Sequence, residues 1–143
     1  MDITNFRLEE GEFDKIQRIL SSLCDMSRLD AVFLINRNGQ EIARHGNADG
    51  IDIVAMSSLA ASNMAATYGL ANILGEEAFS RVLLKGLQHN VLISPAGDEA
   101  LILSLLATDR EKEFSLQRLT QASLVLGDVL KKCTSRDKVI EEF

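Results

Sequence analysis

The sequence is short of basic residues. Its 143 residues include 15 lysines and arginines against 21 aspartates and glutamates, for a net charge of −6. Non-specific nucleic-acid binding requires a basic face, so this balance argues against a nucleic-acid partner. The first residues, MDITNFRLEEGEF, lack the basic and apolar regions of a signal peptide, so we expect a cytoplasmic protein. A hydrophobic fraction of 46% and a charged fraction of 25% are typical of one soluble globular domain.

Residues and motifs that could serve in catalysis or bind a metal or cofactor are also scarce. Cys24 and Cys133 have no CxxC spacing and no neighbouring set of ligand residues in the sequence, so we expect free, buried thiols. His45 and His89 are solitary, and we expect surface histidines rather than metal ligands or general bases. No GxxxxGK[ST] or GxSxG motif is present, so the chain is not itself a GTPase or an esterase of that type. We therefore expect a protein that is not an enzyme, with no catalytic residues, metal or cofactor.

Charge is missing altogether from one long stretch, since no residue between Asp52 and Glu76 is charged. At about 100° per residue, a helix over residues 51–75 has two faces. One face is large and apolar apart from an asparagine, and consists of Met56, Leu59, Asn63, Ala66, Leu70, Ile73 and Leu74. The opposite face is small throughout, and consists of Ser58, Ala61, Ser62, Ala65, Gly69 and Asn72.

A surface helix normally carries charged residues on its outer face, and this helix carries none. We expect the large face to pack in the core and the small face to meet a second protein surface. One alternative is a central helix that its own chain covers on all sides. A membrane span is the other alternative, and six serine, threonine and asparagine residues within residues 57–72 argue against it.

Periodicity and turn signals predict the remaining elements. We expect helices over residues 13–24 and 116–133, the second ended by Thr134 and Ser135. A hairpin is expected over residues 31–45, with its turn at Asn38-Gly39. Further strands are expected over residues 79–85, 91–94 and 100–107, with Pro95 ending the second and the third in the centre of the sheet. Residues 1–12 are expected to be a flexible N-terminal segment, residues 13–134 the domain and residues 135–143 a C-terminal tail.

The predicted order is αββαβββα, an α+β domain with a five-stranded antiparallel sheet. This order resembles that of the roadblock family. The resemblance extends to the hairpin segment AVFLINRNGQEIARHG, to the segment IDIVAMSSLAASNMAATYGLANILGEEAF and to the three closing strands. That family consists of small homodimeric modules of the longin-like dynein light chain type. The resemblance implies a central helix on one face of the sheet and the terminal helices on the other. Within the family, the sequence is most similar to the MglB-type bacterial regulators of cell polarity and motility.

The resemblance implies a homodimer in which the strand over residues 79–85 pairs with its symmetry mate. Its implied interface residues are Phe79, Arg81, Val82, Leu83, Leu84 and Lys85. Pairing two exposed edges removes an aggregation-prone surface and brings the two central helices together. The implied partner-binding residues on those helices are Ser58, Ala61, Ser62, Ala65, Tyr68, Gly69 and Asn72.

The function implied is regulation of an MglA-type Ras-like small GTPase. The paired central helices would bind its switch regions and favour GTP hydrolysis or one nucleotide state. An arginine donated to the GTPase site is conceivable, with Arg44, Arg81 and Arg110 as candidates by exposure alone, but the resemblance points away from it. The alternative is a dimeric scaffold that recruits a signalling or cytoskeletal partner without regulating a GTPase. Tyr68, where the family usually has a small residue, and the tail RDKVIEEF favour that alternative.

Overall fold

A computed structural model of the chain describes residues 2–3, 6–77, 81–109 and 114–141. Its elements are β1 (Asp2–Ile3), β2 (Phe6–Arg7), α1 (Glu10–Ser27), β3 (Ala31–Asn36), β4 (Glu41–Gly46), α2 (Ile53–Leu74), β5 (Val82–Lys85), β6 (His89–Ala96), β7 (Ala100–Ala107) and α3 (Leu116–Glu141). The expected α+β order is confirmed, and the two short strands β1 and β2 precede it as a separate antiparallel pair. The segment over residues 1–12 therefore contains structure that the sequence did not predict.

The main sheet is five-stranded and antiparallel, in the order β4-β3-β7-β6-β5. As expected, β7 lies in the centre, and all but its last residue are buried. The expectation that Pro95 ends its strand is wrong, because β6 continues to Ala96 and Pro95 pairs with Leu101 of β7. Among the described residues, Pro95 has a pairing partner on β7 alone, because the described part of β5 begins at Val82, opposite Ile93. A residue without a backbone N–H is tolerated at such a position.

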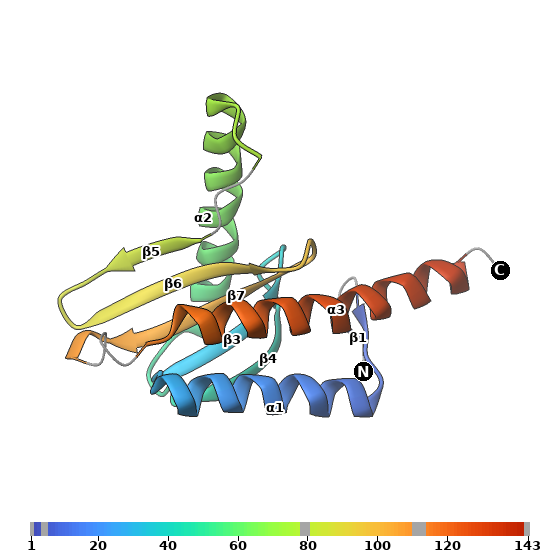
Figure 1. Ribbon diagram of the computed structural model, residues 1–143, viewed down its shortest axis with the longest axis horizontal. Coiled ribbons are helices and arrows are strands. Elements are labelled where there is room, and N and C mark those ends of the chain that lie inside the picture. Colours follow the sequence, from blue (N-terminus) through green and yellow to red (C-terminus); the bar gives the residue numbers. More distant parts are fainter. Residues whose placement is uncertain (1, 4–5, 78–80, 110–113, 142–143) are drawn as a thin grey trace.

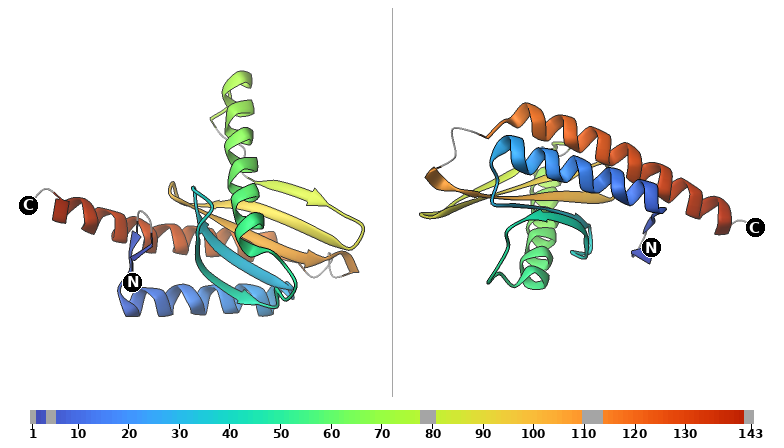
Figure 2. Two further views of the ribbon diagram at one scale, coloured as in Figure 1. Left: turned by 180° about the vertical axis from the view of Figure 1, so that it is seen from behind. Right: turned by 90° about the horizontal axis from the view of Figure 1, so that it is seen from below.

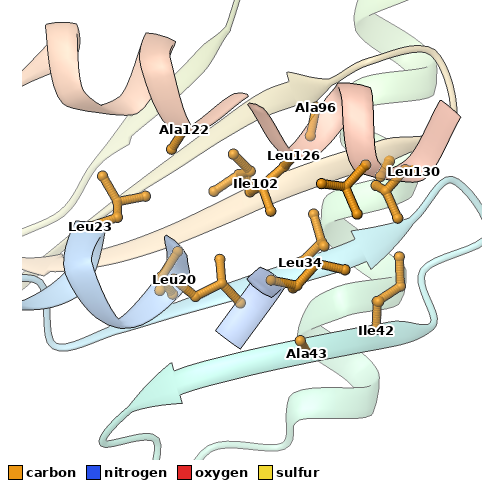
Figure 3. Close-up of a cluster of buried hydrophobic side chains, with 14 of the residues drawn as sticks. Leu20, Leu23, Leu34, Ile42, Ala43, Ala96, Ile102, Ala122, Leu126 and Leu130 are labelled. Atoms are coloured by element: carbon orange, nitrogen blue, oxygen red, sulfur yellow. The ribbon is translucent and has the colours of Figure 1, made fainter. Parts of the chain in front are cut away.

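The sheet lies between two helical layers, with α1 and α3 on one face and α2 on the other (Figures 1 and 2). Figure 3 shows the core between the sheet and the two terminal helices. Leu20 and Leu23 of α1 meet Leu34 of β3 and Ile102 of β7 there, and Leu126 of α3 completes the layer. These aliphatic side chains are each less than 4% exposed, and their burial provides the main stabilisation of this half of the molecule.

Both terminal helices are longer than their periodicity predicts. Helix α1 begins at Glu10, and the Glu12 side chain accepts a hydrogen bond from the backbone N–H of Glu9 at 3.1 Å. This contact satisfies a backbone donor that has no partner within the helix. Helix α3 runs through Thr134 and Ser135 to Glu141, so the expectation that these two residues end it is wrong. Neither residue forbids a helix, and a propensity signal of this size is easily overridden.

A pair of glycines sets the approach of α3 to the sheet. Gly97, in the turn between β6 and β7, has φ of 71°, a left-handed conformation that glycine adopts without strain. A Cβ atom placed on Gly127 of α3 would lie 2.9 Å from the backbone nitrogen of Gly97. The helix therefore rests directly on the backbone of the turn, and any side chain at either position would push it away.

Candidate protein-interaction surface

Helix α2 begins and ends at the residues that its capping signals predict. The Asp52 side chain accepts a hydrogen bond from the Ala55 N–H at 3.1 Å, and Gly75 follows the helix with φ of 75°. The first half of α2 lies across the sheet, and the second half extends past it (Figures 1 and 2). Among the described residues, no helix has the combination of length and hydrophobicity that crossing a bilayer requires.

The side of α2 that faces the sheet is not the one expected. The buried residues of the helix are Ser57, Ala60, Ala61, Met64 and Ala71. Three of them, Ala60, Ala61 and Met64, pack with Phe33, Ile35 and Leu103 of the sheet in a second core cluster. The sheet supplies most of the large side chains of this cluster, and the helix contributes Met64 and two alanines.

The large apolar face of α2 is consequently exposed. Leu59 is 70% exposed and Ile73 is 82% exposed, and Leu70 and Leu74 are also exposed. The expectation that this face packs in the core is therefore wrong for these four residues, whereas Met56 is half-buried and packs against the second core cluster. A helix without charge on any side carries no pattern that tells the core side from the outer side. These four exposed aliphatic residues lie along the same side of the helix, and we call them the large α2 face.

The small face of α2 lies beside the large one rather than opposite to it, because the sheet-facing residues occupy a third side of the helix. Most of the small face is exposed, as expected. Ser58, Ser62, Ala65, Gly69 and Asn72 are all exposed. The hydroxyl of Ser62 donates to the carbonyl of Ser58 at 3.0 Å, so it does not present an unsatisfied donor. Ala61 differs from the expectation, because it is 8% exposed and belongs to the sheet-facing side. We refer to the five exposed residues as the small α2 face.

The turn between β3 and β4 fixes the position of α2. A Cβ atom on Gly39 would lie 2.7 Å from the Cα of Ser58, so the turn is in direct contact with the helix backbone. The Arg37 guanidinium lies 5.0 Å from the centre of the Tyr68 ring, and it donates a hydrogen bond to the Tyr68 hydroxyl at 3.2 Å. Arg37 also donates to the carbonyl of Asp98 in the next turn. Tyr68, expected in the partner-binding set, is thus half-buried and held by its own chain.

The edge strand β5 carries apolar side chains at exposed positions. It pairs with β6 on one side, and Leu83 and Leu84 are 50% and 45% exposed. Val82 and Arg81 are half-buried and Lys85 is exposed. Phe79, the remaining expected interface residue, lies outside the described residues.

The opposite edge of the sheet has a different character. On β4, the Arg44 side chain forms an ion pair with Glu41 at 3.4 Å, and charged residues on an edge discourage pairing with another strand. Of the three arginines considered as donated groups, Arg44 is therefore paired within its own strand. Arg81 is half-buried, and Arg110 lies outside the described residues.

Both cysteines are free and buried, as expected. Cys133 donates a hydrogen bond to a carboxylate oxygen of Glu12 at 2.9 Å, which joins α3 to the start of α1. Burial, and then the nearby carboxylates of Asp25 and Asp30, raise the pKa of the Cys24 thiol from its ordinary 9.0 to about 11.

Cys24 is not isolated in space, although the sequence placed no ligand residues beside it apart from Asp25. One ligand atom each of Cys24, Asp25 and His45 of β4 lies within 4.8 Å of the other two. The register of the hairpin is the sequence signal that could have placed His45 on the same side of the sheet as Cys24. His45 pairs with Val32, a core residue on the α1 side of the sheet, so the two share a face.

Comparison with known proteins agrees with this architecture. The model of the Roadblock/LC7 domain matches residues 15–106. The chain therefore belongs to the Roadblock/LC7 family. Within that family, the solved structures that it resembles include several of the bacterial protein MglB. No curated protein sequence matches the chain.

MglB from Myxococcus xanthus is 28% identical to the chain, with a TM-score of 0.77 over 87% of this chain and 99% of that one. The gliding protein MglB from Thermus thermophilus is 21% identical, with a TM-score of 0.82 over 89% and 96%. An MglB solved in a tetrameric arrangement is also 21% identical, with a TM-score of 0.79 over 90% and 96%. The two structures at 21% identity support the fold alone.

Proposed function

We propose that this protein is a homodimeric regulator of an MglA-type Ras-like small GTPase. The observation that carries the proposal is the surface of α2, where two adjacent faces are exposed and neither has a charged residue. The similarity to the MglB of Myxococcus xanthus supports the same function. The two faces differ in shape, and each suits a different contact.

The large α2 face and the β5 edge suit a second copy of this chain. A β5 strand that pairs with its mate about a two-fold axis joins two sheets and makes one self-complementary interface. The same operation brings two copies of α2 together on one side of the joined sheet. Full burial of one leucine or isoleucine side chain contributes about 1.5–3 kcal/mol, so covering Leu59, Leu70 and Ile73 in each copy favours association strongly.

The small α2 face suits the GTPase. Serine, alanine and glycine side chains lose little rotamer entropy when a partner covers them, and their size permits close backbone approach. Two such faces, side by side in the dimer, would form a platform for the mobile switch regions of a GTPase. A regulator of this kind acts by binding one nucleotide state more tightly than the other.

The test uses the purified protein and an MglA-type GTPase, loaded with GDP or with a GTP analogue. We expect tighter binding to the GTP form and a change in the rate of GTP hydrolysis. The variant Ala65→Arg places a long cation on the small α2 face, and we expect it to weaken binding at least about tenfold.

Gln117→Arg is the matched control, because it adds the same charge to an exposed position on α3, on the other side of the sheet. It should leave binding and hydrolysis unchanged. If wild type and Ala65→Arg, both folded and dimeric, bind the GTPase equally tightly, the small α2 face is not the GTPase-binding surface. A wild-type dimer that binds the GTPase in neither nucleotide state would favour the scaffold function instead.

A further inference from the structure

Three side chains of types that can ligate a metal ion lie close together on the side of the sheet opposite α2. Cys24 and Asp25 come from the last turns of α1, and His45 comes from β4, against which α1 packs. One ligand atom from each residue lies within 4.8 Å of the other two. The His45 Nε2 atom is 3.5 Å from the Asp25 Oδ1 atom.

These distances are close to those of a metal site. A tetrahedral zinc ion holds nitrogen and oxygen at about 2.0–2.2 Å and sulfur at about 2.3 Å, so its ligand atoms lie roughly 3.3–3.6 Å from one another. The separation between the His45 nitrogen and the Asp25 oxygen already fits. The Cys24 sulfur lies within 4.8 Å of the other two atoms and needs a shift of at most about 1.2–1.5 Å, which a side-chain rotation provides.

The surroundings permit entry of an ion from solvent. Cys24 is 3% exposed, whereas the side chains of Asp25 and His45 are 70% and 37% exposed. The sulfur thus forms the floor of the cluster, and the carboxylate and the imidazole form its open side. Sulfur, imidazole nitrogen and carboxylate oxygen together favour Zn²⁺ over the harder ions Mg²⁺ and Ca²⁺.

We propose that Cys24, Asp25 and His45 bind one Zn²⁺ ion, with water in the fourth position. The thiol now donates a weak hydrogen bond to the carbonyl of Leu29 at 3.3 Å. On binding, the sulfur loses its proton to solvent, gives up that hydrogen bond and forms a bond to the ion. The bound ion then joins the end of α1 to the edge strand β4. Because α2 lies on the other face of the sheet, this site is independent of the proposed GTPase contact.

The composition of the chain provides matched controls, since it has two cysteines and two histidines. Tag-free, chelator-stripped protein is titrated with Zn²⁺ in competition with a chromophoric chelator. We expect one ion per chain, and at least about tenfold weaker binding in Cys24→Ser and in His45→Gln. Cys133→Ser and His89→Gln change the same residue types elsewhere, and should bind Zn²⁺ as the wild type does.

Co²⁺ gives a second readout, because a thiolate-to-cobalt charge-transfer absorption band appears only when sulfur is a ligand. We expect the band in the wild type and in Cys133→Ser, and its loss in Cys24→Ser. If far-ultraviolet circular dichroism shows that Cys24→Ser does not fold, His45→Gln and Asp25→Asn decide the question at exposed positions. The proposal is overturned if the wild type lacks the cobalt–sulfur band, or if His45→Gln and Asp25→Asn bind Zn²⁺ with wild-type affinity.

Discussion

At the scale of single residues, the Cys24 thiol couples local chemistry to the stability of the fold. Its pKa is about 11 in the folded chain, against an ordinary value of 9.0, because burial disfavours the thiolate and two carboxylates add to the effect. The folded chain therefore keeps a proton that the unfolded chain releases between these two pH values. The sign follows directly: this contribution to stability is complete below pH 9 and is lost as the pH rises toward 11.

We expect the free energy of unfolding of chelator-treated protein to fall by about 2 kcal/mol over that interval through this thiol alone. Urea titrations at several alkaline pH values, on wild type and Cys24→Ser, isolate the effect. Cys24→Ser should show a smaller decline, because serine does not ionise in this range. An identical decline in both proteins would mean that other groups control the alkaline stability.

Arg37 is a second residue with an effect beyond its own turn. It contacts the ring and hydroxyl of Tyr68 and the carbonyl of Asp98, so Arg37→Ala removes three interactions at once. Because the guanidinium is exposed, we expect a loss of about 1 kcal/mol in the free energy of unfolding. Tyr68→Phe keeps the ring and removes one hydrogen bond, and it should cost about half as much. Urea denaturation compares the two, and an equal loss in both would assign the whole effect to the hydroxyl.

At the scale of elements, local signals predicted which segments form helices and strands, and they failed on orientation. The limits of α2 were predictable because Asp52 and Gly75 act on their own neighbours. Its core-facing side was not predictable, because the choice depends on the large side chains that the sheet presents, such as Phe33. The position of His45 beside Cys24 depends likewise on contacts between distant segments. Both failures concern information that a local window of sequence does not contain.

The glycine contact between α3 and the turn at Gly97 leads to a prediction that the same Gly→Ala change has opposite effects on stability at two positions. Alanine is favoured over glycine by about 1 kcal/mol inside a helix, but at Gly127 its Cβ atom would lie 2.9 Å from the Gly97 nitrogen. We expect Gly127→Ala to destabilise the protein by about 1–3 kcal/mol, since α3 must shift away from the sheet.

Gly69→Ala is the control for that change. A Cβ atom on Gly69 meets nothing within 4 Å, so the same substitution in α2 should stabilise the protein by about 0.5–1 kcal/mol. Thermal unfolding of the two variants measures both effects. A gain in stability from Gly127→Ala would show that α3 does not approach the turn this closely.

At the scale of the whole molecule, the proposed dimer depends on β5 and the large α2 face acting together. The change Leu84→Glu places a charge on the β5 edge and, in a two-fold arrangement, opposes it to its own copy. We expect the dissociation constant of the homodimer to rise at least about tenfold, as measured by sedimentation over a range of concentrations.

Leu124→Glu changes an exposed leucine of α3 instead, and serves as the matched control. It should leave the oligomeric state unchanged. A monomeric wild type, or a dimer that Leu124→Glu disrupts and Leu84→Glu does not, would show that the copies associate through another surface.

The difference between the two edges of the sheet also limits how many copies of the chain can join edge to edge. Only β5 offers apolar, exposed positions, and β4 carries a paired glutamate and arginine. Once two copies have joined through β5, both outer ends of the combined sheet are β4 strands, which repel further strands rather than receive them. In the proposed dimer, edge-to-edge growth would therefore stop after a single step, which gives a closed pair rather than a fibre.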